Sequence, residues 1–202
     1  MTTWHWVRHG PTHQKAFCGW RDVPADLSDR AAIARLNAAL PATALLVSSD
    51  LIRASATADC LSRDCLSLDG RSGGRQRLPD DPGLREFNFG SWEGLDFTAV
   101  SQCCPDLSRA YWEDPGDAAP PGGESWNQTA ARVAVRVAAL NAAWPDADII
   151  AVAHVGVILT QLQQALAIPA AEALGTQIDN LSVTELHHTP QGWQVARINH
   201  SP

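Results

Sequence analysis

The chain lacks any long apolar run. No stretch of its 202 residues approaches the roughly 20 apolar residues that a membrane-spanning helix needs, so we expect no membrane partner. The first run typical of a strand begins within a few residues of Met1, which leaves no room for a signal peptide. These two absences lead us to expect a cytoplasmic protein.

Cysteine is scarce and shows no pairing pattern. The five cysteines form an odd set at positions 18, 60, 65, 103 and 104, and the last two are adjacent. No pair has the spacing of a zinc finger. This pattern argues against a disulfide framework and favours reduced thiols that serve in packing.

Charge is also sparse. Only 18 % of the residues are charged and the net charge is −7, whereas a nucleic-acid partner usually requires a basic face. An anionic small substrate remains compatible, because a few local arginines outweigh a distant negative surface. The 45 % apolar content is that of a globular protein, and we expect one domain over residues 1–202 with a helical or loop cap segment at about 97–123. A homodimer is compatible with the sequence, which carries no signal for an oligomeric state.

Apolar strands alternate with helical patterns along the chain. Strands are predicted at 4–7, 44–48, 148–153, 181–187 and 193–198, and helices at 31–40, 51–61 and 125–144 and after residue 156 to about 166. Asp50 is the expected N-cap of the second helix. Residues 69–82 read as a loop, 84–95 as irregular, and 97–112 as one or two short helices. The alternation predicts an α/β fold around a mainly parallel sheet.

A histidine stands at the end of the first strand. In Arg8-His9-Gly10 the apolar run stops and Gly10-Pro11 breaks it, which would place an imidazole beside a guanidinium at the open edge of a sheet. A free imidazole nitrogen attacks phosphorus or carbonyl carbon. The planar guanidinium fits phosphate oxygens.

A second histidine repeats this arrangement. His154 follows the buried strand 148–153 and precedes a helix, so we expect the N–H groups of Val155 and Gly156 to point outward at the helix start, which favours an anion. Arg53, early in the helix that follows another buried strand, would lie at the same edge. The segment 84–94 offers two carboxyls, Glu86 and Glu93, for protonating a leaving group, and the spacing alone does not choose between them.

A metal site is the competing interpretation of the histidines. His5, His9 and His13 are spaced four residues apart, which on a helix would align three ligands. On a strand broken by Gly10-Pro11 they cannot form such a face, so we expect no metal.

These segments together resemble the histidine phosphatase superfamily, also called the phosphoglycerate mutase-like fold. The resemblance covers nearly the whole chain and rests on ordered motifs, namely Arg8-His9-Gly10-Pro11-Thr12, Ser48-Ser49-Asp50-Leu51 with Arg53-Ala54, Leu84 to Gly94, Gly122-Gly123-Glu124-Ser125, Ala153-His154-Val155-Gly156 and Asn180-Leu181-Ser182-Val183. It implies a three-layer fold with helices on both faces of the sheet.

The resemblance also implies roles for individual residues. His9 would be the nucleophile that forms a phosphohistidine, and Glu86 rather than Glu93 would be the proton donor and then the base. The phosphoryl oxygens would be held by Arg8, Arg53, His154 and the Val155 N–H. No metal or other cofactor would be needed.

Three departures from the family pattern concern the substrate. Lys15 stands where the family usually has Asn, and Leu27 and Ala31 stand in shifted or altered positions of the following segment. Lys15 would reach a second anionic group or point to solvent. Thr12 and Lys15 are therefore further candidates for substrate binding.

The leading hypothesis is a metal-independent phosphatase that acts on a small phosphorylated metabolite. The Gly-x-Trp-Glu-Gly ending of the Glu86 segment resembles the phosphatase branches, which include α-ribazole and broad-specificity phosphatases. A cofactor-dependent phosphoglycerate mutase is the first alternative. A non-catalytic module that binds a phosphorylated ligand on the same fold is the second.

Overall fold

The computed structural model describes residues 1–62 and 75–202, so Cys65 and residues 69–74 of the expected loop lie outside the described residues. The helices and strands in chain order are β1 (Thr2–Arg8), α1 (Arg30–Ala39), β2 (Leu45–Ser48), α2 (Ile52–Ser62), β3 (Gln76–Arg77), α3 (Phe97–Cys103), α4 (Pro105–Glu113), α5 (Trp126–Ala143), β4 (Asp148–Ala153), α6 (Val155–Leu166), α7 (Ala170–Leu174), β5 (Val183–Thr189) and β6 (Gly192–His200).

The described strands form one sheet in the order β3-β2-β4-β1-β5-β6. The strands β3, β2, β4 and β1 run parallel to one another. The last two strands pair antiparallel, β5 with β1 and β6 with β5. The prediction of a mainly parallel sheet is therefore wrong, and the sheet is mixed. A tight turn joins β5 to β6 at Gly192 (φ +117°), and strands joined so closely pair only antiparallel.

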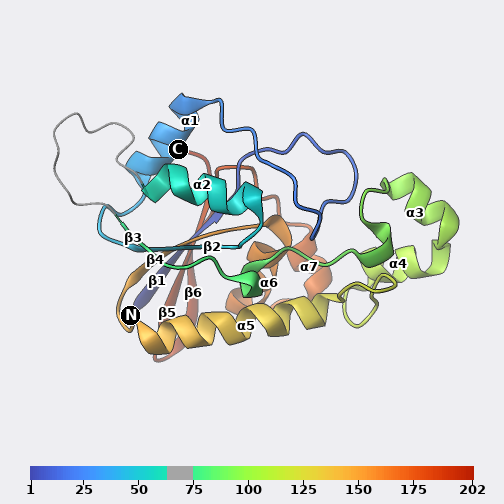
Figure 1. Cartoon of the computed structure of the whole chain (residues 1–202). Coiled ribbons are helices and arrows are strands. Elements are labelled where there is room, and N and C mark those ends of the chain that lie inside the picture. The colour runs from blue at the N-terminus through green and yellow to red at the C-terminus, as the bar shows by residue number, and fades with distance from the viewer. Residues whose placement is uncertain (63–74) are drawn as a thin grey trace.

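Helices cover both faces of this sheet (Figure 1), with α1 and α2 on one face and α5 and α6 on the other. Strand β4 shows why both faces must be covered. Its side chains alternate with a period of two, so that Ile149 and Ala151 join one buried cluster while Ile150 and Val152 join the other. The three-layer arrangement follows from this two-sided burial.

The predicted helices are confirmed to within about two residues at each end. Helix α5 begins with a capping box, in which Ser125 accepts the Gln128 N–H and the Gln128 side chain accepts the Ser125 N–H. The helix buries Trp126, Val133, Val137 and Leu140 along one face, whereas Trp144, just after its end, is 37 % exposed.

The segment 84–95 is irregular as predicted, apart from short 3₁₀ turns at Pro82–Leu84 and Gly90–Trp92. Residues 97–123, which we call the cap segment, contain the two helices α3 and α4. In Figure 1 these helices stand apart at one end of the sheet. Among the described residues, no helix has both the length and the apolar character to cross a membrane.

Candidate active site

The two strand-end histidines meet at one edge of the sheet. His9 follows β1 and His154 follows β4, and these neighbouring parallel strands are in register, with Arg8 opposite Ala153. The two imidazole rings lie 5.0 Å apart, centroid to centroid, at an angle of 61°. Both are buried, with 6 % and 0 % of their surface exposed. Adjacent parallel strands that end together bring side chains distant in sequence into contact.

The two rings hold their protons on opposite nitrogens. His9 Nδ1 lies 2.7 Å from the Gly10 carbonyl, which only accepts, so Nδ1 carries the proton and Nε2 has the lone pair. His154 Nδ1 accepts a hydrogen bond from Arg53 Nε at 3.2 Å, so in the neutral ring the proton is on Nε2. That Nε2 is buried and has no hydrogen-bond partner among the described residues.

Burial keeps both imidazoles neutral. Desolvation, with the nearby positive charges of Arg53 and Arg8, lowers the pKa of His9 to about 3. Desolvation also places the pKa of His154 well below its ordinary value, with smaller contributions from His9 and Arg53. At neutral pH the site thus pairs an unprotonated Nε2 with an Nε2–H donor.

Arg53 is positioned by backbone oxygens. It lies in the first turn of α2, is 1 % exposed, and donates to the carbonyls of Gly19 (2.6 Å) and Arg21 (3.1 Å) as well as to His154. The hydrogen-bond partners found for it in the described part of the chain are all neutral. Its charge is therefore not cancelled by a contacting carboxylate, which suits an anion.

Arg8 completes the cationic side of the site. Its Nη1 donates to the Ile178 carbonyl at 2.5 Å, while its buried Nε has no hydrogen-bond partner in residues 1–62 and 75–202. The loop that carries His9 is fixed by Asn180, whose Nδ2 donates to the His9 carbonyl at 2.8 Å, and by Thr57, whose Oγ1 accepts the Gly10 N–H at 3.1 Å. The nucleophile candidate is held from the loop before β5 and from α2 at once.

Glu86 is the buried carboxyl of the site. Its Oε1 accepts the Phe87 N–H at 3.0 Å and its Oε2 accepts the Gly156 N–H at 3.1 Å. Burial raises its pKa, and these two hydrogen bonds together with Arg53 and Arg8 oppose the rise. A Cβ atom at Gly156 would overlap the Glu86 carboxylate and the Phe87 ring, so only glycine lets α6 start this close.

The contact between Glu86 and Gly156 corrects one expectation. We expected the N–H groups of both Val155 and Gly156 to face a bound anion. The Gly156 N–H instead donates to the Glu86 carboxyl. The Val155 N–H, at the first residue of α6, stays the candidate donor.

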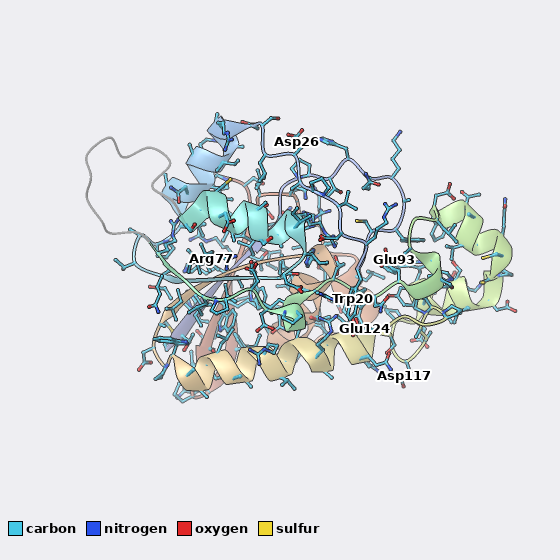
Figure 2. The ribbon with its side chains drawn as sticks, viewed as in Figure 1. Trp20, Asp26, Arg77, Glu93, Asp117 and Glu124 are labelled. Atoms are coloured by element: carbon cyan, nitrogen blue, oxygen red, sulfur yellow. The ribbon has the colours of Figure 1, made fainter. Side chains whose placement is uncertain are left out.

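Glu93 has a different task. Its carboxylate accepts the N–H groups of Gly19 (3.0 Å), Trp20 (2.6 Å) and Phe89 (3.3 Å), and so ties the loop after β1 to the segment that carries Glu86. Figure 2 shows Trp20 and Glu93 between the sheet and the cap segment. This geometry distinguishes the two carboxyls, which the spacing in the sequence could not do.

Several positioning contacts were missed by the sequence analysis. Asp22, rather than Asp50, caps the start of α2 by accepting the Ile52 N–H at 2.7 Å, which corrects the expected N-cap. Asp50 instead binds the Arg85 guanidinium through both oxygens, at 2.7 and 2.6 Å. A cap supplied by a loop 30 residues away leaves no local signal.

An arginine on α5 holds the backbone beside Glu86. Arg132 is paired with Glu124 (2.7 Å) and donates to the carbonyls of Arg85 (2.8 Å) and Glu86 (3.2 Å). The Trp20 indole N–H donates to the same Glu86 carbonyl at 2.8 Å. In the sequence, this contact was indicated only by the motif at residues 122–125, which contains Glu124.

The remaining candidates lie farther out. Lys15 is exposed and Thr12 is half-buried, both on the loop between β1 and α1. The three histidines of the metal hypothesis face different partners, because His5 lies by Asp148 and Glu185 and His13 pairs with Asp26. In the part of the chain that the structure describes, no three His, Cys, Asp or Glu residues are grouped to hold a metal ion.

Comparison with known proteins gives three informative relatives. Glucosyl-3-phosphoglycerate phosphatase of Mycobacterium tuberculosis is 37 % identical over 152 residues, covering 70 % of this chain and 63 % of that protein. The 2,3-bisphosphoglycerate-dependent phosphoglycerate mutase of Methylocella silvestris is 32 % identical over 136 residues, covering 63 % and 62 %. The chain thus spans less than two thirds of the length of these relatives.

The solved structure of YhfR from Bacillus stearothermophilus shares the fold, with a TM-score of 0.85 at 24 % identity over 100 % of this chain and 98 % of that one. The family model described as "Histidine phosphatase superfamily (branch 1)" matches residues 5–201. The match therefore includes both strand-end histidines, both arginines and Glu86, and the chain belongs to branch 1 of the histidine phosphatase superfamily.

Proposed function

We propose that this chain is a metal-independent phosphatase that hydrolyses a small phosphomonoester through a phosphohistidine at His9. The observation that carries the proposal is the pair of hydrogen bonds that assigns opposite tautomers to the two neighbouring neutral imidazoles. Nε2 of His9 carries a lone pair, whereas Nε2 of His154 carries a proton and can donate it in a hydrogen bond. One ring is suited to attack phosphorus and the other to hold a phosphoryl oxygen.

In the first half of the reaction, His9 Nε2 attacks phosphorus. The P–N bond forms, the bond from phosphorus to the alcohol oxygen breaks, and Glu86 gives its proton to that oxygen. Burial supports this role because it raises the pKa of Glu86 and so favours the protonated carboxyl that an acid catalyst requires. The low pKa of His9 supports its role as an unprotonated nucleophile.

Charge on the transferring phosphoryl group is stabilised by fixed donors. Its three equatorial oxygens would face Arg8, Arg53, the His154 Nε2–H and the Val155 N–H. Phosphoryl transfer depends mainly on positioning and on such stabilisation. The proposal needs no metal ion, because these donors supply the compensating charge.

In the second half, Glu86 acts as a base. Its carboxylate takes a proton from a water molecule, whose oxygen attacks the phosphohistidine. The P–N bond breaks, inorganic phosphate leaves, and Glu86 is protonated again. The enzyme returns to its starting state with one ester hydrolysed.

A phosphoglycerate mutase is the second candidate, favoured by the relative from Methylocella silvestris. A non-catalytic binding module is disfavoured, because the chain keeps both a nucleophile candidate, His9, and a buried acid candidate, Glu86. For the phosphatase we propose a cytoplasmic, single-domain protein whose substrate is a small phosphorylated metabolite, with Thr12 and Lys15 as further contacts.

The decisive experiment measures phosphate release and isomerisation in parallel. The wild-type chain is given a panel of phosphomonoesters with and without EDTA, and 3-phosphoglycerate with added 2,3-bisphosphoglycerate. A rapid acid-free quench followed by peptide mass analysis locates any phosphoryl group. The proposal is supported if EDTA leaves the rate of phosphate release unchanged and the phosphoryl group is found on His9. Isomerisation without net phosphate release would establish the mutase instead, and absence of both reactions the binding module.

A further inference from the structure

An aromatic cavity of about 190 Å³ opens beside Glu86. Its walls include Phe87, Phe89, Tyr111, Trp112 and Trp126, which come from the Glu86 segment, from α4 in the cap segment and from the start of α5. Among the described residues that line it, Glu86 is the only charged one. The cavity thus offers apolar contact and one carboxyl, without a lysine or arginine.

The cavity borders the candidate phosphate site through three shared residues. Glu86, Val155 and Gly156 line it, and the same three residues provide the proposed acid, the proposed oxygen donor and the N–H that holds the acid. A phosphoryl group between His9 and His154 would therefore direct its ester oxygen past Glu86 into this space. The position of the cavity beside Glu86 thus suits the alcohol part of a phosphomonoester.

Tyr111 and Thr176 are the uncharged residues with a hydroxyl among the described residues that line the cavity. Tyr111 is 5 % exposed, and it is the one whose hydroxyl is buried without a hydrogen-bond partner in the described part of the chain. Its ring packs edge-on against Trp92 and Trp112, with ring centroids 5.3 and 4.9 Å apart, which restrains the ring. Burial raises the pKa of this hydroxyl, so it stays a donor. A buried donor of this kind discriminates in favour of a ligand that carries an acceptor.

The size of the cavity limits the ligand. An engineered apolar cavity of about 150 Å³ binds benzene, so about 190 Å³ accommodates a single ring or a short branched chain. Resting on the phosphatase function above, we propose that the cavity binds the alcohol part of the phosphomonoester and selects an apolar group, a single ring or branched alkyl chain with one hydrogen-bond acceptor for Tyr111. A polyhydroxylated alcohol would lose its hydrogen bonds to water against the aromatic walls, and a carboxylate-bearing alcohol would be repelled by Glu86. Both should therefore bind more weakly.

The selectivity is tested with esters of matched leaving groups. Benzyl phosphate and glycerol 3-phosphate are both esters of primary alcohols, and 3-phosphoglycerate adds a carboxylate. We expect kcat/KM for benzyl phosphate to exceed that for the other two at least tenfold. Equal values, or a preference for the polar esters, would overturn the selectivity while leaving the phosphatase intact. Failure to hydrolyse any ester would instead overturn the phosphatase, and this proposal with it.

A pair of adjacent substitutions tests the location. Ala118 lines the cavity and Ala119 does not, although both are half-buried in the same loop of the cap segment. Ala118→Arg should lower kcat/KM for benzyl phosphate about tenfold and raise it for 3-phosphoglycerate, with unchanged inhibition by inorganic phosphate. Ala119→Arg should change neither ester. The same response from both variants would show that the alcohol lies elsewhere.

The polar atom is tested by Tyr111→Phe, which keeps the ring and removes the hydroxyl. The three pyridylmethyl phosphates place an acceptor nitrogen at different positions on a benzyl-sized ring. For at least one isomer, the ratio of its kcat/KM to that of benzyl phosphate should fall severalfold in the variant. An unchanged ratio for all three isomers would remove Tyr111 from the proposal.

Discussion

The two halves of the site are built on different principles. The phosphate half, which comprises Arg8, His9, Arg53 and His154, lies at the end of parallel strands and holds its polar groups with backbone carbonyls and with each other. The cap half, formed by the aromatic walls of the cavity, is held by ring packing. The first half is suited to a feature that all phosphomonoesters share, and the second to the part in which they differ.

The comparison predicts two kinds of mutational effect. Substitutions in the phosphate half should reduce turnover of every ester alike, because they act on the phosphoryl group. Substitutions in the cap half should change the ranking of esters. Glu86 borders both halves, so its substitution should both reduce turnover and change the ranking of esters.

The largest effect is expected from His9→Ala, which removes the proposed nucleophile. Turnover of every ester should fall by at least about a thousandfold, the scale seen when a catalytic nucleophile is removed. Steady-state kinetics on benzyl and p-nitrophenyl phosphate measure this, and the circular dichroism spectrum should be unchanged. A variant that keeps its turnover, or loses it for one ester only, would end the assignment.

The boundary between the halves is tested by Glu86→Gln. Without its acid, the variant should lose about a hundredfold or more with benzyl phosphate, whose leaving group needs a proton. It should lose much less with p-nitrophenyl phosphate, whose leaving group does not. Glu93→Gln is the matched control, because Glu93 positions the loop through N–H groups and should affect both esters equally. Equal losses in the Glu86 variant would make this residue another positioning group.

Acid should destabilise the phosphate half. The pKa of His9 is about 3 when folded and about 6.5 when unfolded, so between these values the unfolded chain binds more protons and stability falls as pH falls. From pH 7 to pH 5 this one group accounts for about 2 kcal/mol of lost stability. Urea unfolding at both pH values should show that the wild type loses more than His9→Ala by about this amount. Parallel losses would place the pKa of His9 near its ordinary value.

The smallest effect concerns the cap of α2. Asp22→Ala removes an acceptor from the first turn of the helix that carries Arg53, and should cost about 1 kcal/mol of stability. Asp29→Ala removes the equivalent cap from α1, where Asp29 accepts the Ala32 N–H at 2.9 Å. Both variants should unfold at similarly reduced urea concentrations. Only the first should also weaken inhibition by inorganic phosphate, and equal inhibition constants would disconnect the cap from Arg53.

The same comparison explains what the sequence could predict. The meeting of the two histidines was predictable, because a buried strand, a histidine and a helix start are consecutive in the chain, as at residues 148–156. Arg53 was the weaker case, since its burial depends on carbonyls of Gly19 and Arg21 that no local pattern indicates. The cap half could not be predicted, because its rings come from three segments whose meeting depends on tertiary packing.

The errors have similar causes. The two strands nearest the C-terminus were identified but their direction was not, although a connection of two residues requires an antiparallel pair. The N-cap of α2 was assigned to Asp50 because it precedes the helix, whereas Asp22 reaches in from a distant loop. Local sequence order predicts elements well and long-range partners poorly.

The hydrogen bond from His9 to the Gly10 carbonyl has one more consequence. A main-chain oxygen is not protonated over the range in which proteins fold, unlike the aspartate that orients the imidazole in many hydrolases. The ring is therefore aimed by a partner that never titrates, and its orientation should be the same in mildly acidic and in alkaline solution.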